Sequence, residues 1–181
     1  YHKRQLVPFG EYVPLEHWLR GLIAFFDLPM SMFSSGPARQ APLVLGETRI
    51  ATAICYEIAY PDLVAADAGT ANLLLTVSND TWFGASLGPL QHLQMAQMRA
   101  LENGKPLLRA TNDGITASVD AQGHINAQLP RFGRGVLSAQ VTPRAGATPF
   151  SYWQSRPVAG AAALLCLLAW WVRQRMRVPG D

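Results

Sequence analysis

The chain has 181 residues, enough for one domain with a sizeable hydrophobic core but short for two domains. Hydrophobic residues make up 49% of it and charged residues only 15%, a balance that is unusual for a soluble domain and predicts a membrane-facing surface or a membrane span. The net charge of +3 is modest, and without a dense Lys/Arg run with interleaved aromatics the sequence argues against nucleic-acid binding.

Residues 1–14, YHKRQLVPFGEYVP, place Lys3 and Glu11 on either side of an apolar segment. Pro8 stiffens that segment and Gly10 leaves it free to turn. A buried ammonium can hold an oxyanion, and a carboxylate beside it fixes its position; two ordinary surface charges are the alternative. Because the first residue is a tyrosine and no signal segment precedes it, the chain is expected to begin in mid-domain, as a cleaved product or one piece of a longer protein would.

Residues 12–40 are dense in apolar and aromatic side chains and show no strand alternation. Pro14 and Pro29 interrupt this segment. One interpretation is a core helix followed by a loop. The other is a membrane-facing amphipathic arm, whose aromatic side chains, including Trp18, dip into the membrane interface.

Residues 50–55, IATAIC, predict a strand that ends at Cys55, and a helix is expected to run from Pro61 to just before Gly69. A sharp turn from strand to helix exposes a nucleophile and presents the next backbone N–H, that of Tyr56, to a bound carbonyl. Cys55 is therefore a candidate catalytic nucleophile, with an ordinary structural cysteine as the alternative.

The middle of the chain alternates between strand and helix patterns, which predicts an α/β fold. Residues 72–77, NLLLTV, form the continuous apolar run of a strand buried on both faces. Residues 89–103 have a helical pattern that Gly104 stops. The apolar side chains expected to share one face of this helix are Leu90, Leu93, Ala100 and Leu101. Three short strands with strong turn signals are expected at residues 107–111, 115–120 and 124–129.

Residues 157–172 contain no charged side chain and predict a transmembrane helix of about 24 Å, lengthened by interfacial aromatics at both ends. Arginines follow at once, which by the positive-inside rule makes residues 173–181 a cytoplasmic tail. A buried core helix is the alternative. Residues 142–150, rich in Pro, Gly and Thr, are expected to be a linker to the span.

Several motifs in the right order resemble the nitrilase superfamily of carbon–nitrogen hydrolases. They are YHKRQLVPFGEYVP, CYEIAYPD, SNDTWFG and QHLQMAQMRALENGKPLLRATNDGITASVDAQGHI. The first two, with the C-terminal apolar stretch, are more narrowly similar to the apolipoprotein N-acyltransferase branch. The resemblance covers nearly the whole chain and implies the C-terminal part of such a protein: a partial αββα sandwich over residues 1–150, followed by a transmembrane helix.

That superfamily uses a Glu–Lys–Cys triad, in which the resemblance makes Lys3 the lysine and Cys55 the nucleophile. Glu11 matches an additional glutamate that supports the site, and Tyr56 and Glu57 match a functionally important pair after the cysteine. The general-base glutamate of the triad belongs to a segment upstream of Lys3. The chain by itself is therefore expected to be catalytically silent.

The resemblance also implies a reaction and a location. A fatty acyl group would pass from a phospholipid through a thioester on Cys55 to the N-terminal amine of a diacylglyceryl-cysteine apolipoprotein, at the bacterial inner membrane with the catalytic domain in the periplasm. Trp82 and Phe83 could line an acyl-chain path or cap the core. His92 has no second ligand at metal spacing and no phosphate loop is present, so no metal or cofactor is expected.

Two other functions fit the same residues. A membrane-tethered amidase that hydrolyses carbon–nitrogen bonds would use the same site with water as the acceptor. A membrane-anchored binding or scaffold module with a degenerate site would use none of this chemistry.

Overall fold

The structure, a computed structural model, describes residues 1–12 and 33–176, so Trp18 and most of the 12–40 segment lie outside the described residues. The two interpretations of that segment therefore stay untested. The strands are β1 (Leu43–Leu45), β2 (Thr48–Ile54), β3 (Leu73–Asn79), β4 (Leu107–Asn112), β5 (Ala117–Val119) and β6 (Ile125–Gln128). The helices are η1 (Cys55–Ala59), α2 (Pro61–Ala68), η2 (Thr81–Phe83), α3 (Gly88–Asn103), α4 (Pro149–Trp153) and α5 (Arg156–Met176), with η1 and η2 of the 3-10 type.

The six strands of the described residues form one mixed sheet in the order β1-β2-β3-β4-β5-β6. β2, β3 and β4 are parallel, whereas the outer pairs are antiparallel. Parallel neighbours need crossover connections, and α2 and α3 supply them. In β3 the adjacent residues Leu73 and Leu74 are buried, as predicted, but Val77 of the same run is exposed, and the strand runs on to Asn79. The predicted α/β fold is confirmed.

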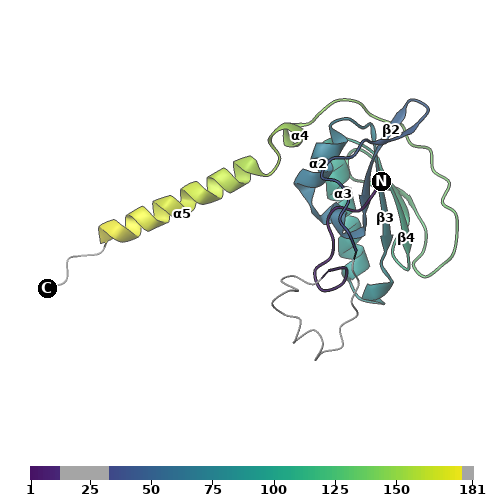
Figure 1. Ribbon diagram of the computed structural model, residues 1–181, viewed down its shortest axis with the longest axis horizontal. Helices are drawn as coiled ribbons and strands as arrows, with labels where there is room; N and C mark the ends of the chain where they lie inside the picture. Colours follow the sequence, from purple (N-terminus) through teal and green to yellow (C-terminus); the bar gives the residue numbers. More distant parts are fainter. Residues whose placement is uncertain (13–32, 177–181) are drawn as a thin grey trace.

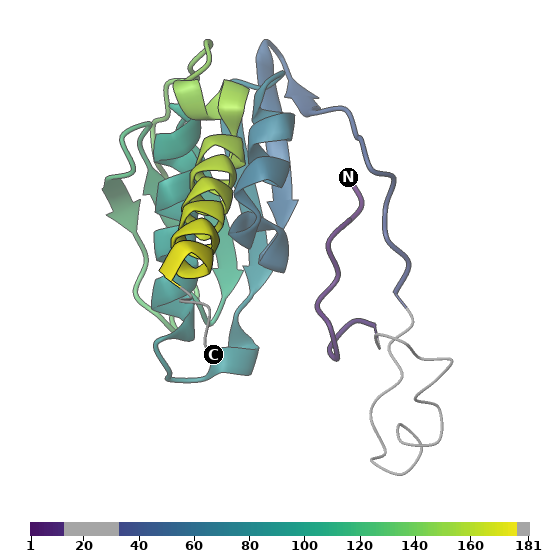
Figure 2. The same cartoon turned by 90° about the vertical axis from the view of Figure 1, so that its left-hand side faces the viewer.

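Both crossover helices lie on the same face of the sheet, as Figures 1 and 2 show. Many of the side chains between these helices and the sheet are alanines, which let the two layers approach closely. The buried hydrophobic residues of this core are Ala51, Ala53, Ile58, Val64, Ala68, Ala71, Leu74, Ala96, Ala100, Leu107 and Val119. The carboxyl ends of β2, β3 and β4 meet at one edge of the sheet, the place where ligands bind in open α/β sheets.

The helix α3 starts within one residue of its predicted position, but the prediction of its buried face is half wrong. Leu93 and Ala100 are buried, whereas Leu90 and Leu101 are exposed. The buried face instead includes polar residues, which are His92, Arg99 and Asn103. A hydrophobic pattern identifies apolar positions alone, so it does not locate a buried stripe that mixes apolar and polar side chains.

The predicted linker comprises residues 142–150. Its C-terminal end is hydrogen-bonded to the helices and is therefore not a free connection. Thr148 accepts a hydrogen bond from the N–H of Ser151 and so caps α4, and its hydroxyl also donates to the last turn of α3. Ser155 donates its N–H and hydroxyl to one carboxylate oxygen of Asp62 in α2, at 3.0 and 2.7 Å. A threonine followed by a proline is an N-cap signal, and it outweighs the loop-like composition here.

The C-terminal helix α5 is longer at both ends than the predicted 157–172 span and includes the first residues of the predicted tail. It extends away from the domain (Figure 1). The most apolar part of α5 has no buried residue, so α5 is not a core helix of the described part. Its 21 residues measure about 30 Å, which matches the hydrocarbon core of a bilayer. Within the described ranges it is the one helix long and apolar enough to cross a membrane.

Candidate active site

Cys55 lies where β2 ends and η1 begins, at the carboxyl edge of the sheet. Its backbone φ is 52°, a left-handed conformation that residues other than glycine rarely adopt. A sharp, strained turn of this kind raises a side chain above the end of a sheet. The half-buried Cys55 side chain lines a pocket there, together with that of Tyr56.

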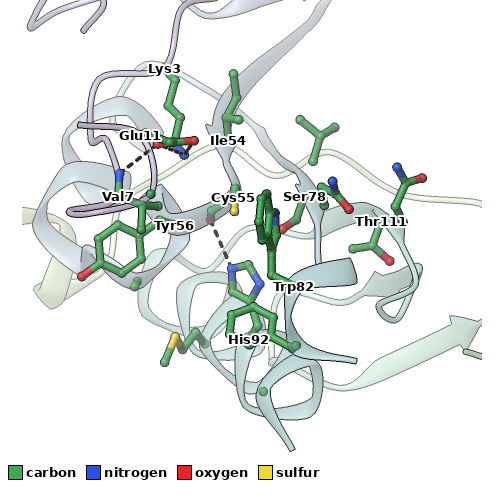
Figure 3. Close-up of a pocket in the computed structure, with 18 of the residues that line it drawn as sticks. Lys3, Val7, Glu11, Ile54, Cys55, Tyr56, Ser78, Trp82, His92 and Thr111 are labelled. Carbon is green, nitrogen blue, oxygen red and sulfur yellow. Dashed lines mark hydrogen bonds and ion pairs between the residues drawn. The ribbon is translucent and has the colours of Figure 1, made fainter. Parts of the chain in front are cut away.

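Lys3 and Glu11 are an ion pair in the same pocket, not two separate surface charges. The Lys3 ammonium donates to both carboxylate oxygens of Glu11 at 2.6 Å, and its side chain is only 13% exposed. The N–H of Val7 donates to Glu11 as well, at 2.8 Å, across a tight turn (Figure 3). The Glu11 carboxylate is therefore held by its own loop, and it holds the Lys3 ammonium in turn.

Glu57 lies behind the turn that bears Cys55 and does not line the pocket. Its carboxylate is fully buried and joins two segments that are far apart in sequence. The N–H of Ile54 at the end of β2 donates to it at 2.7 Å, and the N–H of Arg4 in the Lys3 segment donates at 2.6 Å. The hydroxyl of Tyr1 donates at 3.0 Å. Glu57 thus ties the Lys3 segment to the Cys55 turn.

The Lys3 segment is also supported from its other side by residues 33–42, which run beside it in Figure 2. The N–H of Gly36 donates to the Lys3 carbonyl at 2.8 Å, and Ser35 donates to the Arg4 carbonyl at 3.0 Å. A Cβ on Gly36 would lie 2.7 Å from His2, so this close approach requires glycine.

A buried cluster of three titratable side chains lies beneath Cys55, and sequence reasoning missed it. His92 of α3 contacts Asp80 through Nδ1 at 2.9 Å and the Cys55 carbonyl oxygen through Nε2 at 3.1 Å. Arg109 of β4 donates to the other carboxylate oxygen of Asp80 at 2.6 Å. All three residues are buried. The three residues are far apart along the chain, so no local spacing in the sequence relates them.

The carboxylate is the centre of this cluster. Burial alone would raise the pKa of Asp80, but hydrogen bonds from His92 and Ser78 and the positive charge of Arg109 outweigh burial and hold that pKa below its usual value. Burial lowers the pKa of Arg109, and the Asp80 carboxylate opposes that change. A carboxylate oxygen of Asp80 lies so near Gly114 that a Cβ there would meet it at 2.3 Å.

The pocket above these residues has a volume of about 1240 Å³ and is lined mainly by apolar side chains. Lys3, Glu11 and Cys55 line it, and Trp82 and Phe83 stand at its wall on η2. Trp82 is 88% exposed, so it does not cap the core. In the view of Figure 3, Cys55 lies between Trp82 and the Lys3–Glu11 pair.

Trp18, the remaining predicted contact residue, lies outside the described residues. Within residues 1–12 and 33–176, no three His, Cys, Asp or Glu side chains are grouped so that they could hold a metal ion. The chemistry that this arrangement offers is that of a cysteine and a fixed ammonium that line the same pocket.

A family model described as carbon–nitrogen hydrolase matches residues 1–150. The apolipoprotein N-acyltransferase of Azotobacter vinelandii is 57% identical over 175 residues, which are 97% of this chain and 34% of that protein. The apolipoprotein N-acyltransferase of Pseudomonas aeruginosa is 56% identical over 174 residues, 96% of this chain and 34% of that protein. The chain therefore spans about a third of the length of these curated relatives.

Solved structures show the same fold at lower sequence identity. A CN-hydrolase superfamily protein from Xanthomonas campestris aligns with a TM-score of 0.57 at 20% identity, over 78% of this chain and 51% of that chain.

Proposed function

Because the chain belongs to the carbon–nitrogen hydrolase family, we propose that it is the C-terminal part of a membrane-anchored acyltransferase that acts through a thioester on Cys55. The acyl group would come from a phospholipid and go to the N-terminal amine of a diacylglyceryl-cysteine apolipoprotein. The relatives named apolipoprotein N-acyltransferase, at 56–57% identity, support this reaction over a simple amidase. The chain covers about a third of their length, so the activity is proposed for the whole protein.

One observation carries the proposal: the strained Cys55 turn faces a fixed Lys3–Glu11 pair across an apolar pocket. A thiolate at such a turn is placed to attack a carbonyl. An ammonium that a carboxylate holds in place is preorganised for the negative charge that then develops on the carbonyl oxygen. A pocket of about 1240 Å³ with mainly apolar walls suits a fatty acyl chain better than a small polar amide.

The first half-reaction loads the enzyme. The Cys55 thiolate attacks the ester carbonyl carbon of the phospholipid, and the oxyanion is stabilised by the Lys3 ammonium and the Tyr56 N–H. The bond from the carbonyl carbon to the glycerol oxygen then breaks. The lysophospholipid leaves with a proton on that oxygen, and a thioester remains on Cys55.

The second half-reaction delivers the acyl group. The amino group of the apolipoprotein attacks the thioester carbonyl, the carbon–sulfur bond breaks, and the amine loses a proton as the amide forms. Cys55 is regenerated. Glu57 supports both halves by keeping the Lys3 segment joined to the Cys55 turn, and Trp82, Phe83 and Trp18 are proposed to contact the acyl chains.

Proton transfer in both halves requires a general base. Among the described residues that line the pocket, Glu11 is the one carboxylate, and it is committed to Lys3 and to its own turn. By the family resemblance, the base is assigned to a glutamate upstream of Lys3 in the whole protein.

The membrane placement is part of the same proposal. Residues 1–150 form the catalytic part, α5 crosses the bacterial inner membrane, and the arginines after Trp171 face the cytoplasm, which puts the pocket in the periplasm. The 12–40 segment is proposed to reach toward the lipid. The exposed apolar length of α5 and the exposed Trp82 at the pocket support this arrangement.

The test is intact-mass measurement of the whole protein after exposure to phospholipid vesicles. Wild type should gain the mass of one fatty acyl group and lose it when apolipoprotein is added. Cys55→Ser should gain none, and Cys166→Ser, which changes the cysteine on α5, should behave as wild type. Acyl transfer to the apolipoprotein without any adduct on Cys55 would contradict the proposal.

A further inference from the structure

His92 contacts the turn that bears Cys55, which its position in the sequence does not predict. Both of its ring nitrogens are engaged: Nδ1 contacts the Asp80 carboxylate, and Nε2 contacts the backbone carbonyl of Cys55, the contact drawn in Figure 3. The ring is therefore held between a buried anion and the main chain of the nucleophile turn. It is not directed at the thiol by any hydrogen bond, so this geometry does not make it the base of a Cys–His pair.

The contact with Cys55 fixes the position of one proton on the His92 ring. A carbonyl oxygen can only accept, so Nε2 must carry a hydrogen and donate it. Asp80 lies on the other side of the ring, and Arg109 orients that carboxylate from β4. The chain Arg109–Asp80–His92 thus ends in one N–H group that points at the Cys55 carbonyl.

Holding that carbonyl also orients the next N–H. The peptide unit between Cys55 and Tyr56 is planar and trans, so its C=O and N–H point in opposite directions. When His92 fixes the oxygen on the α3 side, the Tyr56 N–H must point away from α3. The strained φ of 52° at Cys55 makes this restraint necessary, because a relaxed turn would rotate the same peptide.

We propose that His92 is a positioning residue for acyl transfer: its Nε2–H holds the Cys55–Tyr56 peptide so that the Tyr56 N–H is aimed at the developing oxyanion. This inference rests on the proposed function, since it concerns the same nucleophile. It goes further by assigning the Asp80–His92–Arg109 cluster, which contributes no nucleophile and no base, to the orientation of one backbone donor.

Two substitutions in the whole protein separate this role from simple packing. In His92→Asn the short amide can still reach Asp80 at the place of Nδ1 but not the Cys55 carbonyl. In His92→Gln the longer amide can donate near the place of Nε2. Gln94→Asn, at an exposed position of the same helix, is the matched control.

Each variant is tested with two reagents that react with Cys55. A short-chain p-nitrophenyl ester acylates the sulfur, releases p-nitrophenolate and passes through an oxyanion. Iodoacetamide alkylates the sulfur, releases iodide and forms no oxyanion. We expect His92→Asn to slow acylation by about 10²-fold, the loss typical of one oxyanion donor, with alkylation changed by less than about threefold. His92→Gln should recover most of the acylation rate.

Acylation and alkylation that fall by the same factor in His92→Asn would mean that His92 only supports the fold, and would overturn the inference. Acylation at the wild-type rate in His92→Asn, or no recovery in His92→Gln, would overturn it too. The ester test does not depend on lipid: if the p-nitrophenyl ester acylates wild type but phospholipid does not, the proposed function fails while the role of His92 is still decided.

Discussion

Replacing Glu57 by glutamine should loosen the Lys3 segment from the nucleophile turn. The carboxylate accepts four hydrogen bonds in a fully buried place: from the N–H groups of Arg4, Gln5 and Ile54 at 2.6, 3.3 and 2.7 Å, and from the Tyr1 hydroxyl at 3.0 Å. Glutamine has one acceptor oxygen, and its amide nitrogen would face donors. Two of the four hydrogen bonds should therefore be lost.

The size of the effect follows from the charge on the acceptor. A hydrogen bond to a charged group contributes about 1.5–3 kcal/mol, so two lost bonds set an upper range of about 3–6 kcal/mol. Local rearrangement should recover part of this, and we expect about 3 kcal/mol for the docking of the Lys3 segment. This corresponds to roughly a hundredfold larger population of the undocked state.

Hydrogen exchange followed by mass spectrometry measures that population directly. In Glu57→Gln, peptides that contain Arg4 and Ile54 should exchange roughly a hundredfold faster, if exchange proceeds through undocking, and formation of the acyl adduct on Cys55 should slow. Glu47→Gln, an exposed glutamate in the turn between β1 and β2, is the control and should change neither. Unchanged protection of both peptides in Glu57→Gln would refute the reasoning that this carboxylate joins the two segments.

Three further predictions concern the cluster and the pocket. Gly114→Ala should destabilise the domain by about 1–3 kcal/mol in chemical unfolding, because its Cβ would meet the Asp80 carboxylate at 2.3 Å, whereas Gly69→Ala, with its nearest atom at 3.5 Å, should be almost neutral. The folded-state pKa of Asp80 is lowered, so its contribution to stability is present above its usual pKa of about 3.9 and is lost as pH falls through the lowered value. The difference in unfolding free energy between wild type and Asp80→Asn should therefore shrink below about pH 4; a constant difference down to pH 2 would contradict this. Trp82→Ala should leave the unfolding midpoint unchanged, because the side chain is 88% exposed, yet raise the KM for phospholipid severalfold, while the exposed control Val136→Ala should do neither.

Local patterns were sufficient for much of the fold. The apolar run of β3, the proline at the start of α2 and the glycine after α3 each act within a few residues, so they could be identified along the chain. Thr148 is a further local signal. The composition of residues 142–150 predicts a linker, but a threonine before a proline caps the short helix α4 there.

The sequence by itself determined the candidate nucleophile, since Cys55 stands where a strand-like run meets a turn, and the motif resemblance singled out Lys3, Glu11 and Glu57. Only the tertiary structure decided what these residues touch: Glu57 lies behind the turn, and Lys3 is held by Glu11. His92 lies on α3, Asp80 directly follows β3, and Arg109 lies on β4, and no spacing along the chain relates them. Their contacts arise because parallel strands with helices on one face bring their carboxyl ends together, and that is a property of the assembled sheet.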